Sequence, residues 1–157
     1  MEITIRAASR GDVEAILPLW REMMEYHTHL DPRFQPAPRA EKHWTEALSR
    51  WLKDDDYCIL VAEAKGRLVG YIIGTIKNSP PVLLPSEFGF ITDICVTPEW
   101  RRTGVGCRLY EALQEWFNER GLNVVQLNVA QRNRVSQAFW EEIGFQGYME
   151  YMWKEIQ

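Results

Sequence analysis

Two arginines and two glycines stand where the chain is predicted to change from a strand to a helix. The segment runs from Arg101 to Gly106, after a β-rich run from Phe88 to Val96 and before a helical apolar pattern. A helix N-terminus has backbone N–H groups without internal partners and a partial positive charge, so it binds anions. Glycine lets a ligand approach the backbone, and arginine adds charge and donors. The turn therefore predicts a site for a pyrophosphate group.

Other phosphate-binding turns fit this segment less well. A dinucleotide fingerprint, G-x-G-x-x-G, requires glycine where this chain has Leu109, and no acidic residue ends the following strand near Val129. A P-loop requires a Gly-Lys-Ser/Thr ending, which is absent. A tight structural turn without a ligand remains an alternative on the turn alone.

Two motifs in the second half of the chain resemble the signatures of the GNAT acetyltransferase superfamily. Residues Ile94 to Gly106 resemble its acyl-CoA-binding signature, Arg/Gln-x-x-Gly-x-Gly/Ala. Residues Asn133 to Phe145 match the second signature, an asparagine followed by a helix that ends in an aromatic residue and then Gly-Phe. The order of predicted elements agrees over nearly the whole chain. The resemblance implies an N-acetyltransferase that moves an acetyl group from acetyl-CoA, as cosubstrate, directly to the amine of a small molecule or protein in a ternary complex.

The resemblance also implies which residues hold the cofactor. Strand backbone would contact the pantetheine arm, the turn would hold the pyrophosphate, and residues of the second motif would lie beside the arm and the thioester. The residues are Ile94, Cys95, Val96, Arg101, Arg102, Thr103, Gly104, Val105, Gly106, Asn133, Phe139 and Trp140. In this family the sheet splays between the strands that end here at Val96 and Val129, and the arm pairs in that gap. Strand-like pairing orients a flexible thioester and offers its carbonyl a backbone donor.

Acetyl transfer also requires a base, because an alkyl ammonium with a pKa of about 10.4 attacks only after it loses a proton. Asp93 is the candidate, since burial beside the thioester would raise the pKa of its carboxyl, and Glu87 is the reserve. A purely structural role for Asp93, as a loop cap or an arginine partner, remains open.

The acid that protonates the leaving thiolate is a separate question. Many members of the family have a tyrosine for this purpose where this chain has Trp140, whose indole N–H is not a usable acid. The proton would then come from water, from Tyr148 or from Tyr151, or the thiolate would leave unassisted. This departure favours the alternative function, a non-catalytic acyl-CoA-binding sensor or interaction module.

Composition limits the remaining classes of protein. The chain has 157 residues, of which 46% are hydrophobic and 25% charged, as is usual for a globular protein, and we expect a single domain over residues 1–157. A net charge of −4 argues against a nucleic-acid partner. No apolar run is long enough for a membrane helix, and the N-terminus does not resemble a signal peptide, so a cytoplasmic location is expected.

The cysteines and histidines do not predict a metal site. Cys58, Cys95 and Cys107 lack the spacing of a zinc or redox pair, so we expect reduced thiols. His27 and His29 would face different sides of a helix, which favours surface or acceptor-pocket histidines over metal ligands.

The elements that must position these residues follow the order of a mixed α/β protein. We expect a single-domain central sheet of about six or seven strands flanked by about four helices, the acyl-CoA N-acyltransferase type. Pro18 predicts a kink or break in the first helix, and the prolines between Asn78 and Ser86 predict a surface loop. The aromatic-rich run from Tyr148 to Trp153 predicts a final strand that could pair across a homodimer.

Overall fold

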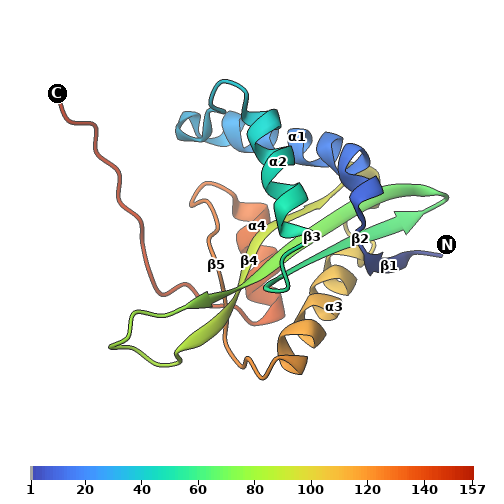
Figure 1. The fold of residues 1–157 in the computed structure, drawn as a ribbon. Helices are drawn as coiled ribbons and strands as arrows, with labels where there is room; N and C mark the ends of the chain where they lie inside the picture. Colours follow the sequence, from blue (N-terminus) through green and yellow to red (C-terminus); the bar gives the residue numbers. More distant parts are fainter. Residues whose placement is uncertain (1) are drawn as a thin grey trace.

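A mixed five-stranded sheet forms the centre of the computed structural model, which describes residues 2–157 (Figure 1). The strands lie in sequence order; the first four are antiparallel, and the fifth is parallel to the fourth. They are β1 (Thr4–Ala7), β2 (Tyr57–Ala64), β3 (Arg67–Asn78), β4 (Glu87–Val96) and β5 (Val125–Leu127). Strands β2 and β3 form an antiparallel hairpin, and its turn residues Lys65 and Gly66 both have positive φ, as its tight connection requires.

Helices cover both faces of the sheet. They are α1 (Val13–Leu30), α2 (Ala40–Trp51), α3 (Val105–Glu119) and α4 (Arg134–Ile143), with short 3₁₀ turns at Arg10–Asp12, Pro32–Phe34 and Pro98–Trp100. In Figure 1, α1 and α2 lie above the sheet, and α3 and α4 lie on its other face. Of the kink or break predicted at Pro18, a break is wrong, because α1 continues through this residue. None of the helices in residues 2–157 is long and apolar enough to cross a membrane.

Alternating side chains on the inner strands divide the core between the two faces. In β2, Ile59 and Val61 pack toward α1 and α2, whereas Leu60 and Ala62 pack toward α3. All four side chains are buried. The two-sided burial explains why the strand is an almost continuous apolar run, and it fixes the sheet as a rigid base for the turn before α3.

The last predicted strand is absent, so within residues 2–157 the sheet has five strands rather than six or seven. Residues 146–157, here called the C-terminal tail, form an extended segment that leaves the body of the molecule (Figure 1). The run from Tyr148 to Trp153 has the composition of a strand, but a strand exists only where its backbone groups find a neighbour. Within residues 2–157 the tail has no such neighbour.

Candidate active site

The sheet opens along β4. Strand β5 pairs with β4 over three positions only, from Gly89↔Val125 to Ile91↔Leu127. Immediately afterwards the β3–β4 register shifts, because Ile73 pairs with Asp93 and its neighbour Gly74 pairs with Ile91, which leaves Thr92 as the extra residue of a bulge. From Asp93 to Val96, β4 is paired with β3 on one side and with no strand of residues 2–157 on the other. The predicted splay is therefore present, and it contains Ile94, Cys95 and Val96.

Contacts between α1 and α4 confirm that this gap passes through the sheet. The two helices cover opposite faces, yet Nε2 of His27 in α1 lies 3.3 Å from Nδ2 of Asn133 at the start of α4. Arg132 also donates to the carbonyl oxygen of Leu30 at 3.3 Å. Helices on opposite faces can touch only where no strand lies between them.

The predicted pyrophosphate turn exposes unpaired backbone donors. Arg102 has φ 61° and Gly104 has φ 90°, so two residues just before α3 have a left-handed backbone conformation. Within residues 2–157, the backbone N–H groups of residues 102–107 donate no hydrogen bond. Consecutive N–H groups in such a conformation form a concave anion site, and the positive end of α3 adds to it.

Side chains around the turn hold its shape. Thr103 Oγ1 donates to the carbonyl oxygen of Trp100, which closes the turn from inside. Arg101 Nε donates to the carbonyl oxygen of Val96 at 3.0 Å, and its terminal nitrogen lies 3.4 Å from a carboxylate oxygen of Glu22 in α1. Arg101 therefore ties the turn to β4 and α1, whereas the exposed Arg102 makes no ion pair within residues 2–157.

Glycine is required at the two positions of the turn for different structural reasons. Gly104 stands in open space, but its positive φ strains any residue with a Cβ. Gly106 has an ordinary φ, and a Cβ there would lie 3.2 Å from the ring of Phe139 in α4. Gly104 thus shapes the turn, and Gly106 allows α3 and α4 to pack closely.

Asn133 is buried, with 3% of its surface exposed, and it performs two tasks. Its Oδ1 accepts a hydrogen bond from the backbone N–H of Ser136 at 3.1 Å, which caps α4. Its Nδ2 points to Nε2 of His27. Because Nδ1 of His27 lies 2.9 Å from the carbonyl oxygen of Met23, we assign the imidazole hydrogen to Nδ1 and leave Nε2 free to accept from Asn133.

Asp93 lies on β4 just past the bulge, half-buried among side chains from three elements. Burial raises the pKa of its carboxyl from 3.8 to about 6. The indole of Trp44, the imidazole of His27 and the hydroxyl of Tyr71 act in the opposite direction and limit this rise in pKa. The structure thus brings Asp93, His27 and Asn133 toward the same gap. Sequence reasoning treated His27 only as a surface or pocket histidine, since no local pattern reports a contact across 106 residues.

Other predicted candidates are placed less favourably. Glu87 is exposed at the start of β4, about 20 Å along the strand from Asp93, so it is not available as a second base. Trp140 is only 5% exposed and packs edge-on against Tyr110 and Phe145, as part of the core. Tyr151 lies in the tail and is 86% exposed.

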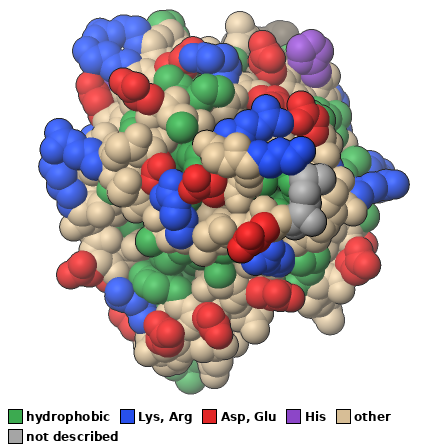
Figure 2. All heavy atoms as spheres, turned by 90° about the vertical axis from the view of Figure 1, so that its right-hand side faces the viewer, with side chains coloured by type: hydrophobic (Ala, Val, Ile, Leu, Met, Phe, Trp, Pro, Cys, Tyr) green, Lys and Arg blue, Asp and Glu red, His purple; other side chains and the backbone are tan. Residues whose placement is uncertain are grey.

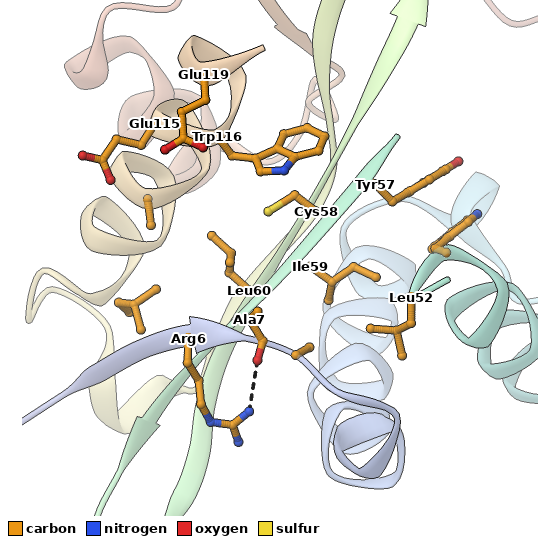
Figure 3. Close-up of a pocket in the computed structure, with 14 residues that line it drawn as sticks. Arg6, Ala7, Leu52, Tyr57, Cys58, Ile59, Leu60, Glu115, Trp116 and Glu119 are labelled. Carbon is orange, nitrogen blue, oxygen red and sulfur yellow. Dashed lines mark hydrogen bonds between the residues drawn. The ribbon is translucent and has the colours of Figure 1, made fainter. Parts of the chain in front are cut away.

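A hollow lies on another part of the molecule. A pocket of about 480 Å³ is bordered by β1, the start of β2, the end of α2 and the C-terminal half of α3. Figure 3 shows Trp116 and Glu119 on one side of it and Leu52 and Tyr57 on the other. Its lining contains none of the residues predicted to bind the cofactor.

The face of the molecule shown in Figure 2 carries acidic and basic side chains in alternation. Its lysine and arginine side chains do not merge into one basic patch. Nucleic-acid binding depends on a concentrated basic surface, and this face does not provide one.

Comparison with known proteins identifies the fold and the family. The model of the Acetyltransferase (GNAT) family matches residues 18–145 of the chain. The chain belongs to the GNAT acetyltransferase family. It is therefore an acetyl-CoA-dependent N-acetyltransferase.

Individual relatives are distant. The uncharacterized N-acetyltransferase YhfO of Bacillus subtilis (strain 168) is 24% identical over 155 residues, which is 95% of each chain. The aminoglycoside 6'-N-acetyltransferase AAC(6')-IG of Acinetobacter haemolyticus superposes with a TM-score of 0.77 at 20% identity, over 98% of this chain and 99% of that one. A predicted acetyltransferase of Clostridium acetobutylicum, solved with acetyl-CoA, gives a TM-score of 0.79 at 17% identity, over 98% of this chain and 96% of that one. At these identities the two solved structures show a shared fold.

Proposed function

We propose that residues 1–157 act as a single GNAT domain that transfers the acetyl group of acetyl-CoA directly to the amine of a small molecule or a protein, in a ternary complex. The observation that carries this proposal is the row of free N–H groups at residues 102–107, placed at the end of the open edge of β4. The turn matches a diphosphate, and the open edge matches an extended arm that ends in a thioester.

The residues at the gap fit this cofactor. Backbone groups of Ile94, Cys95 and Val96 pair with the pantetheine arm, and the turn from Arg101 to Gly106 holds the pyrophosphate, with the exposed Arg102 supplying charge. Phe139, which is half-buried against Gly106, lines the arm. Asn133 hydrogen-bonds to an amide group of the arm. Trp140 packs against Phe139 from the side of the core.

Asp93 is the proposed base. With a pKa of about 6, its carboxyl is ionised at neutral pH and still basic enough to take a proton from an acceptor ammonium, directly or through water. His27 lies close enough to Asp93 for a protonated imidazole to favour the ionised carboxylate. Since Trp140 is not an acid, the departing thiolate takes its proton from solvent.

The acceptor is proposed as a small cationic amine. Members of the fold include the aminoglycoside acetyltransferase noted above, which supports aminoglycosides as the first compounds to test. Asp31 and Glu87 are placed less favourably than Asp93 for binding a cationic acceptor. Asp31 is paired with Arg33 at 2.6 Å, and Glu87 is exposed at the far end of β4. Asp93 is therefore the carboxylate on which this proposal depends.

The test is a thiol-release assay with acetyl-CoA against aminoglycosides, polyamines, amino acids and peptide N-termini. The expected result is release of one thiol for each acetylated product detected by mass spectrometry, with at least one of these classes. Thermal unfolding with and without acetyl-CoA is measured in parallel. Stabilisation by acetyl-CoA without thiol release from any class would favour the sensor, which the Trp140 substitution supports; no stabilisation at millimolar acetyl-CoA would contradict both functions.

We also propose that the protein works in the cytoplasm as a homodimer. Cys58, Cys95 and Cys107 are all free thiols, which suits a reducing compartment. Separation of cell fractions followed by immunoblotting tests the location.

A further inference from the structure

The hollow beside β1 lies at an edge of the sheet that lacks a strand. Strand β1 pairs with β2 from Thr4↔Glu63 to Ala7↔Leu60, so within residues 2–157 the start of β2, residues 57–59, has no strand on its outer side. The hollow occupies this place, and its volume of about 480 Å³ lies in the usual range for small-molecule sites. Because β1 and β5 are the opposite edges of the sheet, the hollow is separate from the gap between β4 and β5.

Aromatic side chains border the hollow on two sides. The rings of Trp51, at the end of α2, and Tyr57, at the start of β2, are stacked, with ring centroids 5.1 Å apart and an interplanar angle of 8°. Trp116 of α3 lies across the hollow from Tyr57 (Figure 3). All three side chains are half-buried, so each keeps an accessible part. Because α2 and α3 cover opposite faces of the sheet, a ligand in the hollow would contact aromatic surface from both faces.

The α3 side of the hollow carries negative charge that its own chain does not neutralise. Glu115 and Glu119 line it one helical turn apart, and neither makes an ion pair within residues 2–157. Two carboxylates at this spacing repel each other, and the C-terminal end of a helix also disfavours negative charge. The basic residue of the lining, Arg6, is already paired with Asp12 at 2.8 Å and with Glu63 at 2.9 Å. The lining therefore attracts a cation.

A guanidinium beside the hollow shows that Trp116 attracts cations. The side chain of Arg120 lies over the indole of Trp116, with its Cζ 4.2 Å from the ring centroid. The negative face of an aromatic ring attracts a cation placed in this way. Arg120 is not part of the lining, so its guanidinium does not occupy the hollow, but it offsets one of the two carboxylate charges on this side. The remaining charge matches a ligand with a single positive charge.

We propose that this hollow binds a small organic cation, with a single positive charge on a compact aromatic or branched aliphatic body. Glu115 and Glu119 pair with the charge, and the three aromatic rings contact the body. A quaternary ammonium ion is the class that fits best, because its charge is spread over carbon substituents that pack against aromatic faces. The site does not depend on the acetyl-transfer mechanism, and none of the residues proposed to bind acetyl-CoA belongs to its lining.

Titration of the ¹⁵N-labelled full chain with benzyltrimethylammonium, followed by NMR, tests the site. This cation has no N–H bond, so it cannot be an acetyl acceptor. The indole N–H signals of Trp51 and Trp116, assigned from Trp51→Phe and Trp116→Phe variants, should shift at millimolar cation, and that of Trp140 should not. Benzyl alcohol, a neutral compound with the same ring, should bind more weakly by roughly tenfold or more.

Several results of this titration would overturn the proposal. Equal affinity for the cation and for benzyl alcohol would show an apolar groove without selection for charge, which an uncharged segment or a second copy of the chain could cover. Absence of any shift, or shifts confined to other tryptophans, would show that the hollow does not bind the cation. Loss of the shifts when acetyl-CoA is added would place the cation at the cofactor site.

Removal of the two carboxylates tests how the charge is recognised. Glu115→Gln/Glu119→Gln should bind benzyltrimethylammonium roughly tenfold more weakly than wild type, with a thermal midpoint that is equal or higher because the like charges are gone. Glu111→Gln is the matched control, because Glu111 is also exposed on α3, one turn before Glu115, but lies outside the lining. It should bind the cation like wild type. A double variant with wild-type affinity for the cation would contradict the site.

Discussion

Nε2 of His27 and Nδ2 of Asn133 lie 3.3 Å apart, although 106 positions separate the two residues in the sequence. His27 belongs to α1 and Asn133 to the N-terminus of α4, on opposite faces of the sheet. Their contact crosses the gap between β4 and β5, beside the half-buried carboxyl of Asp93. The gap therefore brings together Asn133, which is proposed to bind the cofactor, a carboxylate and a histidine.

Replacement of Asn133 should separate its two tasks. Asn133→Ala removes the cap of α4 and should lower the free energy of unfolding by about 1 kcal/mol. Asn133→Ser retains a capping oxygen but is too short to meet His27, so it should restore most of the stability. Both variants should bind acetyl-CoA more weakly in calorimetric titrations. If Asn133→Ser binds as tightly as wild type, the contact with His27 and the amide Nδ2 have no part in binding.

Gly104→Val should abolish stabilisation by acetyl-CoA. Valine at φ 90° distorts the turn and covers its N–H groups, and the backbone strain costs roughly 1–3 kcal/mol. Gly121→Val is the matched control, since Gly121 also has a positive φ and open space around it, but it lies after α3. Thermal unfolding should show a lower midpoint for both variants without ligand. Only Gly121→Val should recover with acetyl-CoA, by about 2.7 kcal/mol at a hundredfold excess over Kd; equal recovery would rule out the turn as the anion site.

Asp93→Asn should slow acetyl transfer roughly 100-fold or more and leave acetyl-CoA binding intact. In the wild type, kcat/KM should rise with pH as the carboxyl loses its proton near pH 6, because the ionised form is the base. The variant should lack this rise. Measurement of kcat/KM from pH 5 to 8 with the best acceptor decides the matter, and a variant with the wild-type profile would exclude Asp93 from the mechanism.

The same carboxyl should make the fold less stable at neutral pH. The pKa of Asp93 is about 6 in the folded state and 3.8 for a free carboxyl, so between these values the folded state binds more protons. Its contribution to stability is therefore full below about pH 4 and is lost as the pH rises through 6. The urea midpoint of Asp93→Asn minus that of wild type should therefore be larger at pH 8 than at pH 4. An equal difference at both values would contradict the raised pKa.

Gly89→Ala should destabilise the junction of β4 and β5. A Cβ at Gly89 would lie 2.7 Å from the ring of the fully buried Phe117, and a core of this density has no room for it, so the loss should be about 1–3 kcal/mol. Gly11→Ala is the control, because the nearest atom would be 3.8 Å away. Urea unfolding monitored by tryptophan fluorescence measures both. A Gly89→Ala variant as stable as Gly11→Ala would show that β4 can shift freely at this position.

Local sequence patterns determined most elements of the fold and the turn. The glycines and arginines from Arg101 to Gly106 predict an anion site because strand, turn and helix each depend on residues close in the chain. The hairpin at Lys65-Gly66 was predictable for the same reason, since its positive φ values are a property of two residues.

Contacts between distant segments were decided only by the tertiary structure. The residues from Tyr148 to Trp153 have the composition of a strand, but pairing requires a neighbouring edge, and within residues 2–157 the tail has none. In the same way, Asp93 was recognisable as a carboxylate on a strand. Its raised pKa was not, because it depends on burial by distant elements, among them His27 of α1, Trp44 of α2 and Tyr71 of β3. Composition and spacing act over a few residues, but burial and strand pairing depend on which distant segments meet, and the packing of the helices on the sheet decides that.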